Sequence, residues 1–237
     1  MICVIAPGNR RASSSSAEAL PRAWKTVPQD DHHRVPPSAE MDDFEGYVDP
    51  WSLFGVWMAQ ARLSEPNDPH AMTLATAGCD GLPDARIVLL KSYDERGLVF
   101  FTNERSAKGM QLAENAQAAV VLHWERLCRQ VRARGAVLPI DPAESDAYFA
   151  RRPRGSRLGA VASRQSEPLA DRETLLLEVD AVTTRFEGRP VLRPSHWKGF
   201  RLVPVAFEFW RGRGYRLHDR IRFTQCDAGW TSGRLYP

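Results

Sequence analysis

The residues best suited to chemistry lie near the C-terminus, in the run Arg216-Leu217-His218-Asp219-Arg220. If this run is an extended strand, alternate side chains share a face, and Arg216, His218 and Arg220 point to one side. Two cations beside a titratable imidazole are costly together unless an anion binds them. A solvated basic edge strand would carry the same residues, so this run alone leaves both interpretations open.

A second candidate is the apolar run that begins at Arg86 and ends at Lys91. A core strand with solvated ends has this pattern too. Because the two cations are five positions apart, they point to opposite faces of a strand and could serve two anions. The next strand ends near Thr102, and Ser106 and Lys108 then open a helix. Backbone N–H groups, a hydroxyl and an ammonium at a helix N-terminus suit a phosphate.

Tyr148, Arg152 and Ser156 form a third candidate group, at successive spacings of four. Pro153 and Gly155 predict that the helix ends near residue 151 or 152, which places Ser156 in the following turn. Two hydroxyls and a guanidinium suit a phosphate monoester. A basic surface turn is the alternative.

Three further positions are weak signals by themselves. Gln130 lies in an otherwise apolar and basic strand, and Gln165-Ser166 lies in the loop that leads into a long helix. Isolated glutamines are usually surface residues. Trp197 could equally be a core aromatic.

Composition bounds the class of protein. The 237 residues, 43% hydrophobic and 26% charged, are typical of a soluble globular protein with a single domain. Net charge is only +3, but arginine greatly outnumbers lysine, which favours recognition of phosphate or carboxylate. The four cysteines are far apart and lack metal-ligand spacing, which predicts free thiols in the cytoplasm and no metal site. No apolar run approaches the roughly 18 residues of a membrane span.

The chain divides into a disordered N-terminal extension, residues 1–40, and one domain, residues 41–237. The extension is rich in serine and proline without a hydrophobic period. Met41 is a candidate translation start, and a transit peptide is a less favoured reading of the extension.

The domain is predicted to be mainly β with flanking helices. Asp49-Pro50 caps a helix that runs to about residue 63, Ser106 caps one to about 114, and Asp141-Pro142 opens one to about 151. Residues 168–187 carry apolar side chains at helical spacing, which predicts a core-facing helix. Short β-type runs favour an antiparallel barrel over a parallel sheet. They cover residues 72–77, 85–92, 98–102, 118–124, 128–138, 200–210, 216–224 and 229–235.

Taken in order, these motifs resemble the pyridoxine/pyridoxamine 5′-phosphate oxidase family. The similar runs are RIVLLK, FFTN with the following Ser and Lys, RQV, YFARRPRGSRLGA, SRQS, HWKGFR, EFW and RLHDR. They cover about residues 49–237, and RLHDR and the YFxxRPRxSxxG segment are the most specific. The resemblance implies an FMN-binding split β-barrel in a cytoplasmic homodimer, with two sites at the subunit interface. The segment from about residue 195 to 237 would serve dimerisation and substrate binding.

The resemblance also implies which residues bind the ligands. FMN would be held by Arg86, Ile87, Val88, Leu89, Leu90, Lys91, Phe101, Thr102, Lys108, Gln130, Gln165, Ser166, Trp197 and Arg220, some of them from the partner subunit. The substrate phosphate would contact Lys91, Tyr148, Arg152 and Ser156, and Arg216, Leu217 and His218 would lie over the substrate ring. Arg216 would orient the substrate and supply charge, and His218 would make a polar contact with the ring substituents.

The implied reaction oxidises pyridoxamine or pyridoxine 5′-phosphate to pyridoxal 5′-phosphate. Dioxygen reoxidises the flavin and yields hydrogen peroxide, and the amine substrate also yields ammonia. Three departures from the family pattern stand out: Ala107 replaces a frequent polar residue, Phe101 replaces a frequent tyrosine, and no Arg-Arg-x-Tyr lid motif precedes Asp49.

Three rival functions share some of these sequence features. A flavin oxidase of phenazine biosynthesis shares the fold but acts on a larger aromatic acid, and the complete phosphate-binding set speaks against it. A flavin- or pyridoxal-phosphate-binding carrier without turnover would not need both Arg216 and His218. Nucleic-acid binding lacks a concentrated basic stripe.

Overall fold

The structure is a computed structural model that describes residues 44–237. The predicted disordered segment 1–40 and the proposed start at Met41 lie outside the described residues.

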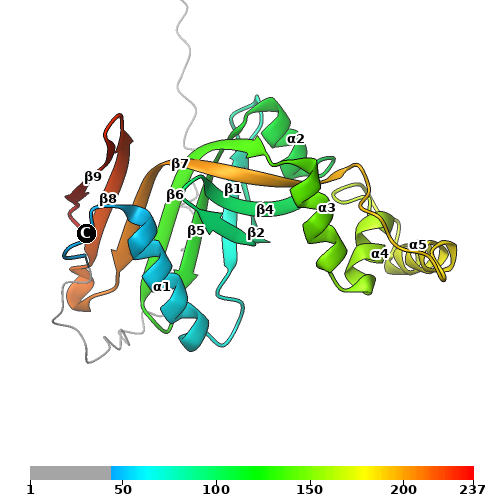
Figure 1. Ribbon diagram of the computed structural model, residues 1–237, viewed down its shortest axis with the longest axis horizontal. Helices are drawn as coiled ribbons and strands as arrows, with labels where there is room; N and C mark the ends of the chain where they lie inside the picture. Colours follow the sequence, from blue (N-terminus) through cyan, green and yellow to red (C-terminus); the bar gives the residue numbers. More distant parts are fainter. Residues whose placement is uncertain (1–43) are drawn as a thin grey trace, which may run out of the picture. The chain divides into compact units, whose positions relative to one another are not determined.

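Within this part of the chain, the strands form one antiparallel sheet of nine members. The strands are β1 (Ala71–Ala77), β2 (Pro83–Leu89), β3 (Ser92–Asp94), β4 (Gly97–Asn103), β5 (Gln117–Trp124), β6 (Arg129–Pro139), β7 (Trp197–Arg211), β8 (Asp219–Cys226) and β9 (Gly229–Arg234). Their order is β2-β1-β5-β6-β7-β4-β3, with β8 paired to β7 and β9 to β8. The sheet curls until β2 approaches β4, which confirms the predicted split β-barrel (Figure 1).

Strand β7 organises the sheet because its 15 residues pair with three neighbours. Its first half pairs with β4, its second half pairs with β8, and β6 follows it along nearly its whole length. A shift in register between Arg134 and Gly135 bends the β6–β7 pair. Such a bend lets the long strand β7 pair with β4 in its first half and with β8 in its second half.

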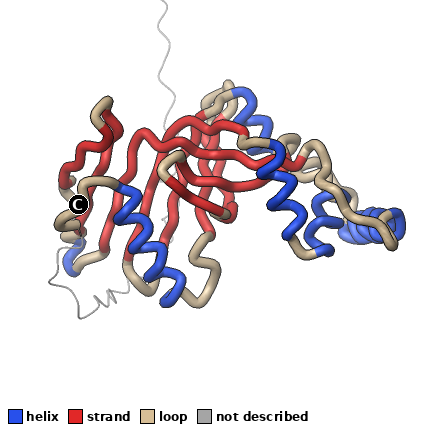
Figure 2. The backbone as a smooth tube through the Cα atoms, in the orientation of Figure 1, coloured by secondary structure: helices blue, strands red, loops and turns tan. Residues whose placement is uncertain are grey.

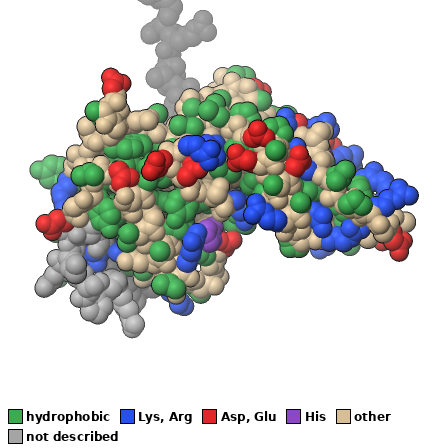
Figure 3. Space-filling view, in the orientation of Figure 1, with side chains coloured by type: hydrophobic (Ala, Val, Ile, Leu, Met, Phe, Trp, Pro, Cys, Tyr) green, Lys and Arg blue, Asp and Glu red, His purple; other side chains and the backbone are tan. Residues whose placement is uncertain are grey.

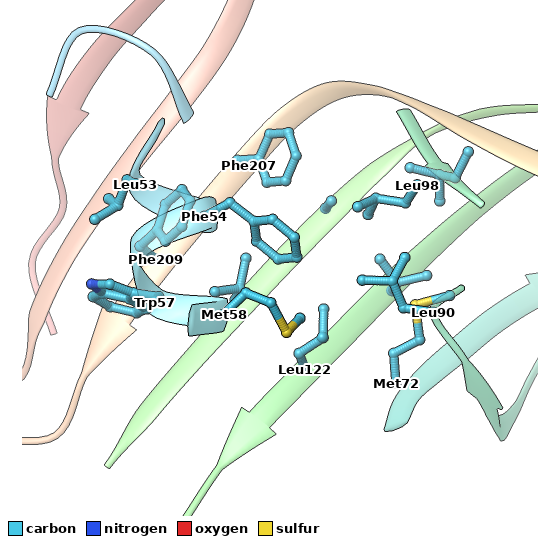
Figure 4. Close-up of a cluster of buried hydrophobic side chains, with 14 of the residues drawn as sticks. Leu53, Phe54, Trp57, Met58, Met72, Leu90, Leu98, Leu122, Phe207 and Phe209 are labelled. Atoms are coloured by element: carbon cyan, nitrogen blue, oxygen red, sulfur yellow. The ribbon is translucent and has the colours of Figure 1, made fainter. Parts of the chain in front are cut away.

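Helix α1 (Pro50–Ser64) closes the inner face of the sheet. Its Phe54 and Trp57 are buried and contact aromatic rings of the sheet: Phe54 lies 6.3 Å from Phe207 and Trp57 lies 5.3 Å from Phe209, between ring centroids. Figure 4 shows these side chains from α1 meeting residues of the sheet in one apolar cluster. Burial of such large aromatic side chains is the main stabilising contribution of this helix.

The remaining helices are placed by the connections between strands. Helix α2 (Ala107–Glu114) joins β4 to β5, and α3 (Pro142–Arg151), α4 (Arg154–Ala162) and α5 (Arg172–Arg185) lie between β6 and β7. Figure 2 shows α3, α4 and α5 gathered beyond one end of the strands. The predicted caps are confirmed: Asp49, Ser106 and Asp141 each accept a hydrogen bond from the first turn of their helix.

Two predictions about these elements were wrong. The apolar stripe of residues 168–187 does form helix α5, but none of the helix residues is buried, because α5 packs mainly on α4. Val182 and Phe186 pack, only partly buried, against a small cluster that contains Trp197. The extended run 216–224 begins as strand only at Asp219, since residues 214–216 form a 3-10 turn in which Tyr215 and Arg216 have φ of 57° and 61°. The alternation predicted for Arg216, His218 and Arg220 therefore does not apply.

Candidate functional site

One cavity of about 440 Å³ gathers most of the predicted ligand-binding residues. Such a volume is within the range of small-molecule sites. The predicted residues in its lining are Ile87, Val88, Leu89, Lys91, Phe101, Thr102, Lys108, Tyr148, Arg152, Ser156, Gln165 and Trp197. They come from β2, β4, β7, α2, α3, α4 and the connections beside them, so segments far apart in sequence meet here. Figure 3 shows that Lys and Arg side chains are concentrated over the part of the molecule built by α3, α4 and α5.

The first cationic position of the cavity is Lys108, in the first turn of α2. Its Nζ lies 3.1 Å from the Ser106 hydroxyl and 3.1 Å from Oε1 of Gln165. The side chain is buried, and this burial, together with the nearby Arg86, lowers the pKa of Lys108. An ammonium held at a helix N-terminus within a cavity is a suitable seat for a phosphate.

The second cationic position is Arg152, at the end of α3. Its Nη1 is buried and has no hydrogen-bond partner among residues 44–237, and burial lowers the pKa of the guanidinium. The guanidinium carbon lies 5.0 Å from the ring centroid of Trp197, which fixes the side chain by a cation–π contact. A buried N–H group without a partner carries an energetic penalty that an anionic ligand would remove.

Three parallel aromatic rings line the cavity beside Arg152. The ring centroid of Phe101 lies 4.2 Å from Tyr148 and 4.8 Å from Trp197, and both pairs are inclined by only 8°. Arg193 supports this wall from behind, because it bridges Asp146 of α3 and the carbonyl of Trp197 at 2.7 and 2.8 Å. Flat apolar walls of this kind suit a planar ligand.

Ser156 lies at the start of a second helix. Helix α4 begins directly after Pro153, so Ser156 lies in the first turn of a new helix and not in a turn that merely follows α3. Proline at this position ends α3 and allows a new helix to start. Tyr148, Arg152 and Ser156 nevertheless face the same cavity.

Arg86 is outside the lining of this cavity. Its Nη1 donates to the Thr76 hydroxyl at 2.5 Å, and its Nη2 donates to Asp84 at 2.6 Å and to Gln111 at 3.1 Å. Gln111 belongs to α2, so Arg86 ties the helix that carries Lys108 to the sheet. Two more predicted residues are outside the lining: Leu90 packs in the main core, and Ser166, with φ of 75°, lines a separate small pocket.

A second set of predicted residues lies on the opposite face of the sheet from α1. Gln130 pairs with Trp210, and Trp210 pairs with Arg220, so the three form one row across β6, β7 and β8. Arg216, Leu217 and His218 occupy the connection between β7 and β8 at the end of this row. None of the five predicted residues in this set lines the cavity of the same subunit.

The β7–β8 connection is held in a defined conformation. Arg213 donates through Nε to Asp219 at 2.5 Å, which closes the loop, and the backbone N–H of Arg213 donates to Nδ1 of His218 at 3.1 Å. An acceptor role for Nδ1 places the proton of the neutral imidazole on Nε2. The imidazole also lies 4.7 Å from the Trp210 ring, between centroids.

Sequence reasoning missed four residues of the cavity lining: Asn103, Gly159, Ala160 and Ser163. Asn103 follows the predicted Thr102 directly and could have been included from that position. The other three are small residues of α4 and its C-terminal end, which approach the cavity mainly because they leave room for a ligand.

A curled antiparallel sheet with a cation-lined cavity at its edge is the split β-barrel architecture of flavin-dependent oxidases. A solved structure, PhzG from Burkholderia lata 383 in complex with tetrahydrophenazine-1-carboxylic acid, is similar with a TM-score of 0.78 and 30% identity, over 88% of this chain and 100% of that one.

The chain belongs to the pyridoxamine 5′-phosphate oxidase family. The sequence profile of pyridoxamine 5′-phosphate oxidase matches residues 58–186, and that of the pyridoxine 5′-phosphate oxidase C-terminal dimerisation region matches residues 197–237. The chain is 49% identical to a pyridoxine/pyridoxamine 5′-phosphate oxidase of Caulobacter vibrioides, over 88% of this chain and 94% of that protein. It is 53% identical to the oxidase of the same name from Azorhizobium caulinodans, over 82% and 93%. In residues 44–237 no helix has both the length and the apolar character needed to span a bilayer.

Proposed function

We propose that the protein is an FMN-dependent oxidase that converts pyridoxamine 5′-phosphate and pyridoxine 5′-phosphate to pyridoxal 5′-phosphate. The observation that carries this proposal is that Lys108 and Arg152 line one cavity, since two phosphate esters need two cationic positions. Relatives about half identical to the chain carry the name of this activity.

The residues near α2 suit the phosphate and ribityl chain of FMN. Lys108 and the Ser106-capped helix N-terminus supply positive charge, and Thr102 and Gln165 supply polar contacts beside them. The exposed strand β2 offers Ile87, Val88 and Leu89 to the same cavity. Arg86 contributes indirectly, because its hydrogen bond to Gln111 holds α2, the helix that carries Lys108, against the sheet.

The residues near α3 and α4 suit the substrate phosphate. Lys91, Tyr148, Arg152 and Ser156 all line the cavity, and a phosphate would supply an acceptor to the buried Nη1 of Arg152. The flat rings of Phe101 and Trp197 limit the ligand to a planar one. These four polar groups would bind and orient the phosphorylated substrate.

We further propose that the remaining residues come from the partner subunit of a homodimer. Gln130, Arg220, Arg216 and His218 form a coherent set on the open face of the sheet, outside the cavity of their own subunit. The match to a dimerisation region over residues 197–237 supports this arrangement. In it, Arg216 orients the substrate and supplies positive charge, and His218 makes a polar contact with the ring substituents.

A flavin held by these residues would supply the redox chemistry, the two-electron oxidation of the substrate's 4′ carbon with dioxygen as the final acceptor. The alcohol and dioxygen give the aldehyde and hydrogen peroxide, and the amine also consumes water and releases ammonia. The protein's residues hold the phosphate and place positive charge near the ring.

A second candidate is oxidation of a phenazine precursor, because PhzG from Burkholderia lata is similar over almost the whole chain. An aromatic acid has no phosphate, so it would leave Arg152 or Lys91 without the phosphate oxygens that these cations would otherwise bind. The phosphate-binding set therefore favours the first function.

The direct test is to purify the full chain, record its visible spectrum, and supply each phosphorylated vitamer in air. A bound flavin, released peroxide and an aldehyde product are expected. Flavin binding without turnover of either vitamer would refute the proposed reaction. The R216A and H218A variants should lose turnover while they retain FMN; wild-type rates in both would remove these residues from the catalytic assignment.

A further inference from the structure

We infer that Glu208 is a positioning residue that fixes the guanidinium of Arg220 for contact with the flavin. This inference rests on the proposed function, in which Arg220 belongs to the cofactor site. Glu208 itself is given no role by the sequence motifs beyond its place in the EFW run.

Glu208 is buried on the open face of the sheet, with 7% of its surface exposed. Its Oε1 accepts hydrogen bonds from Nε and Nη2 of Arg220 at 3.0 and 2.8 Å. Its Oε2 accepts a hydrogen bond from Nη2 of Arg132 at 2.5 Å. One carboxylate therefore serves two guanidinium groups, on β6 and on β8.

Arg220 is constrained at all three of its nitrogens. Besides the two bonds to Glu208, its Nη1 donates to the carbonyl of Tyr236 at 2.8 Å. A guanidinium has five N–H donors, so two of them, one on each terminal nitrogen, remain without a partner within residues 44–237. Two N–H groups on a plane of fixed orientation match the oxygen and nitrogen acceptors along the edge of a flavin ring.

The surroundings of Glu208 explain why a carboxylate is needed. Arg222 lies directly across from it on β8, and Arg134 lines the same shallow groove, so the local charge without Glu208 would be strongly positive. Like charges would push the Arg220 side chain away from its neighbours. The negative charge of Glu208 holds the Arg220 side chain in one conformation, whereas repulsion without it would favour several.

The test compares FMN binding to deflavinated protein, by quenching of FMN fluorescence, for wild type, E208Q, R220A and the double variant E208Q/R220A. Loss of a charged hydrogen-bond pair weakens binding roughly 10- to 100-fold. We expect E208Q and R220A each to weaken FMN binding by that range. In the R220A background E208Q should have almost no further effect, because its influence passes through Arg220. The matched control is R222A, which removes a guanidinium on the same face and should remain within about 2-fold of wild type.

Several results would overturn the inference. These are wild-type FMN affinity in E208Q, wild-type affinity in R220A, and independent, additive losses in the double variant, which would mark Glu208 as a general structural residue. If E208Q does not fold, E208D replaces it: its carboxylate is shorter and should weaken FMN binding by an intermediate factor, and wild-type affinity there would equally refute the role. A wild-type protein that binds no FMN would instead refute the proposed function.

Discussion

Replacement of Arg152 by methionine should separate ligand binding from stability. Methionine keeps most of the unbranched apolar stem but removes every N–H donor. We expect R152M to lose affinity for phosphorylated ligands while the ligand-free protein keeps its stability.

The magnitudes follow from the contacts of Arg152. Loss of charge-assisted hydrogen bonds to a phosphate costs about 1.5–3 kcal/mol, which is about a 10- to 150-fold loss in kcat/KM. In the ligand-free protein, removal of the partnerless Nη1 relieves about 1–3 kcal/mol. Loss of the cation–π contacts with Trp197 and Phe149 costs about 1 kcal/mol each. The two effects nearly cancel, so Tm should change by no more than about 4 °C.

The assay measures KM for pyridoxine 5′-phosphate and the dissociation constants of pyridoxal 5′-phosphate and pyridoxal in the flavin-loaded protein. In R152M, KM and the dissociation constant should rise only for the phosphorylated ligands. R152K keeps the charge without the planar guanidinium, so its affinity for these ligands should lie between those of wild type and R152M. Equal weakening of pyridoxal and its phosphate, or a large fall in Tm with unchanged KM, would refute the assignment of Arg152 to a phosphate.

Three further predictions concern the FMN side of the cavity and its walls. Burial lowers the pKa of Lys108 below 10.5, so FMN affinity should fall as pH rises through that lowered pKa, and K108R should move the fall to higher pH. Because folding penalises the charged form of Lys108, the ligand-free protein should become more stable over the same rise in pH. The same pH dependence of FMN affinity in K108R and wild type would contradict this prediction. S106A removes the acceptor for the N–H of Gly109 and should lower the free energy of unfolding by about 1 kcal/mol in urea denaturation, where no change would show that the cap is dispensable. G199A places a methyl group 2.6 Å from Cε1 of Phe101 and should destabilise the protein by about 1–3 kcal/mol, with a lower Tm and weaker binding of pyridoxal 5′-phosphate; an unchanged Tm would mean that the aromatic wall yields freely.

Sequence reasoning located the elements whose ends are chemically marked. Asp49, Ser106 and Asp141 were identified as helix caps because their side chains satisfy backbone N–H groups locally. Helix α5 was predicted, but the element against which it packs was not. An apolar stripe indicates that one face of a helix is covered, but it does not identify the covering element. The fold of the β7–β8 connection was missed because the positive φ of Tyr215 and Arg216 has no signature in those residue types.

The candidate site was predictable where charge or aromaticity marks it and hidden where the backbone or a small residue forms it. Lys91, Lys108, Tyr148 and Arg152 line one cavity as the resemblance implied. Gly159 and other small lining residues carry no chemical signature. The assignments of all ligand-binding residues, including those attributed to the partner subunit, remain predictions for the experiments above.

Helix α4 and the segment that follows it supply one wall of the cavity, and α5 packs on α4. Because α5 contains no buried residue, its opening exposes little apolar surface and should cost far less than global unfolding. Gln165, which contacts Lys108, lies in the segment that joins these two helices. Occupancy of the cavity would then govern how fast amide protons of this segment exchange and how readily a protease cuts it. Loss of the flavin in a cell would mark the protein for degradation through this segment first, so supply of the cofactor would set the lifetime of the polypeptide as well as its activity.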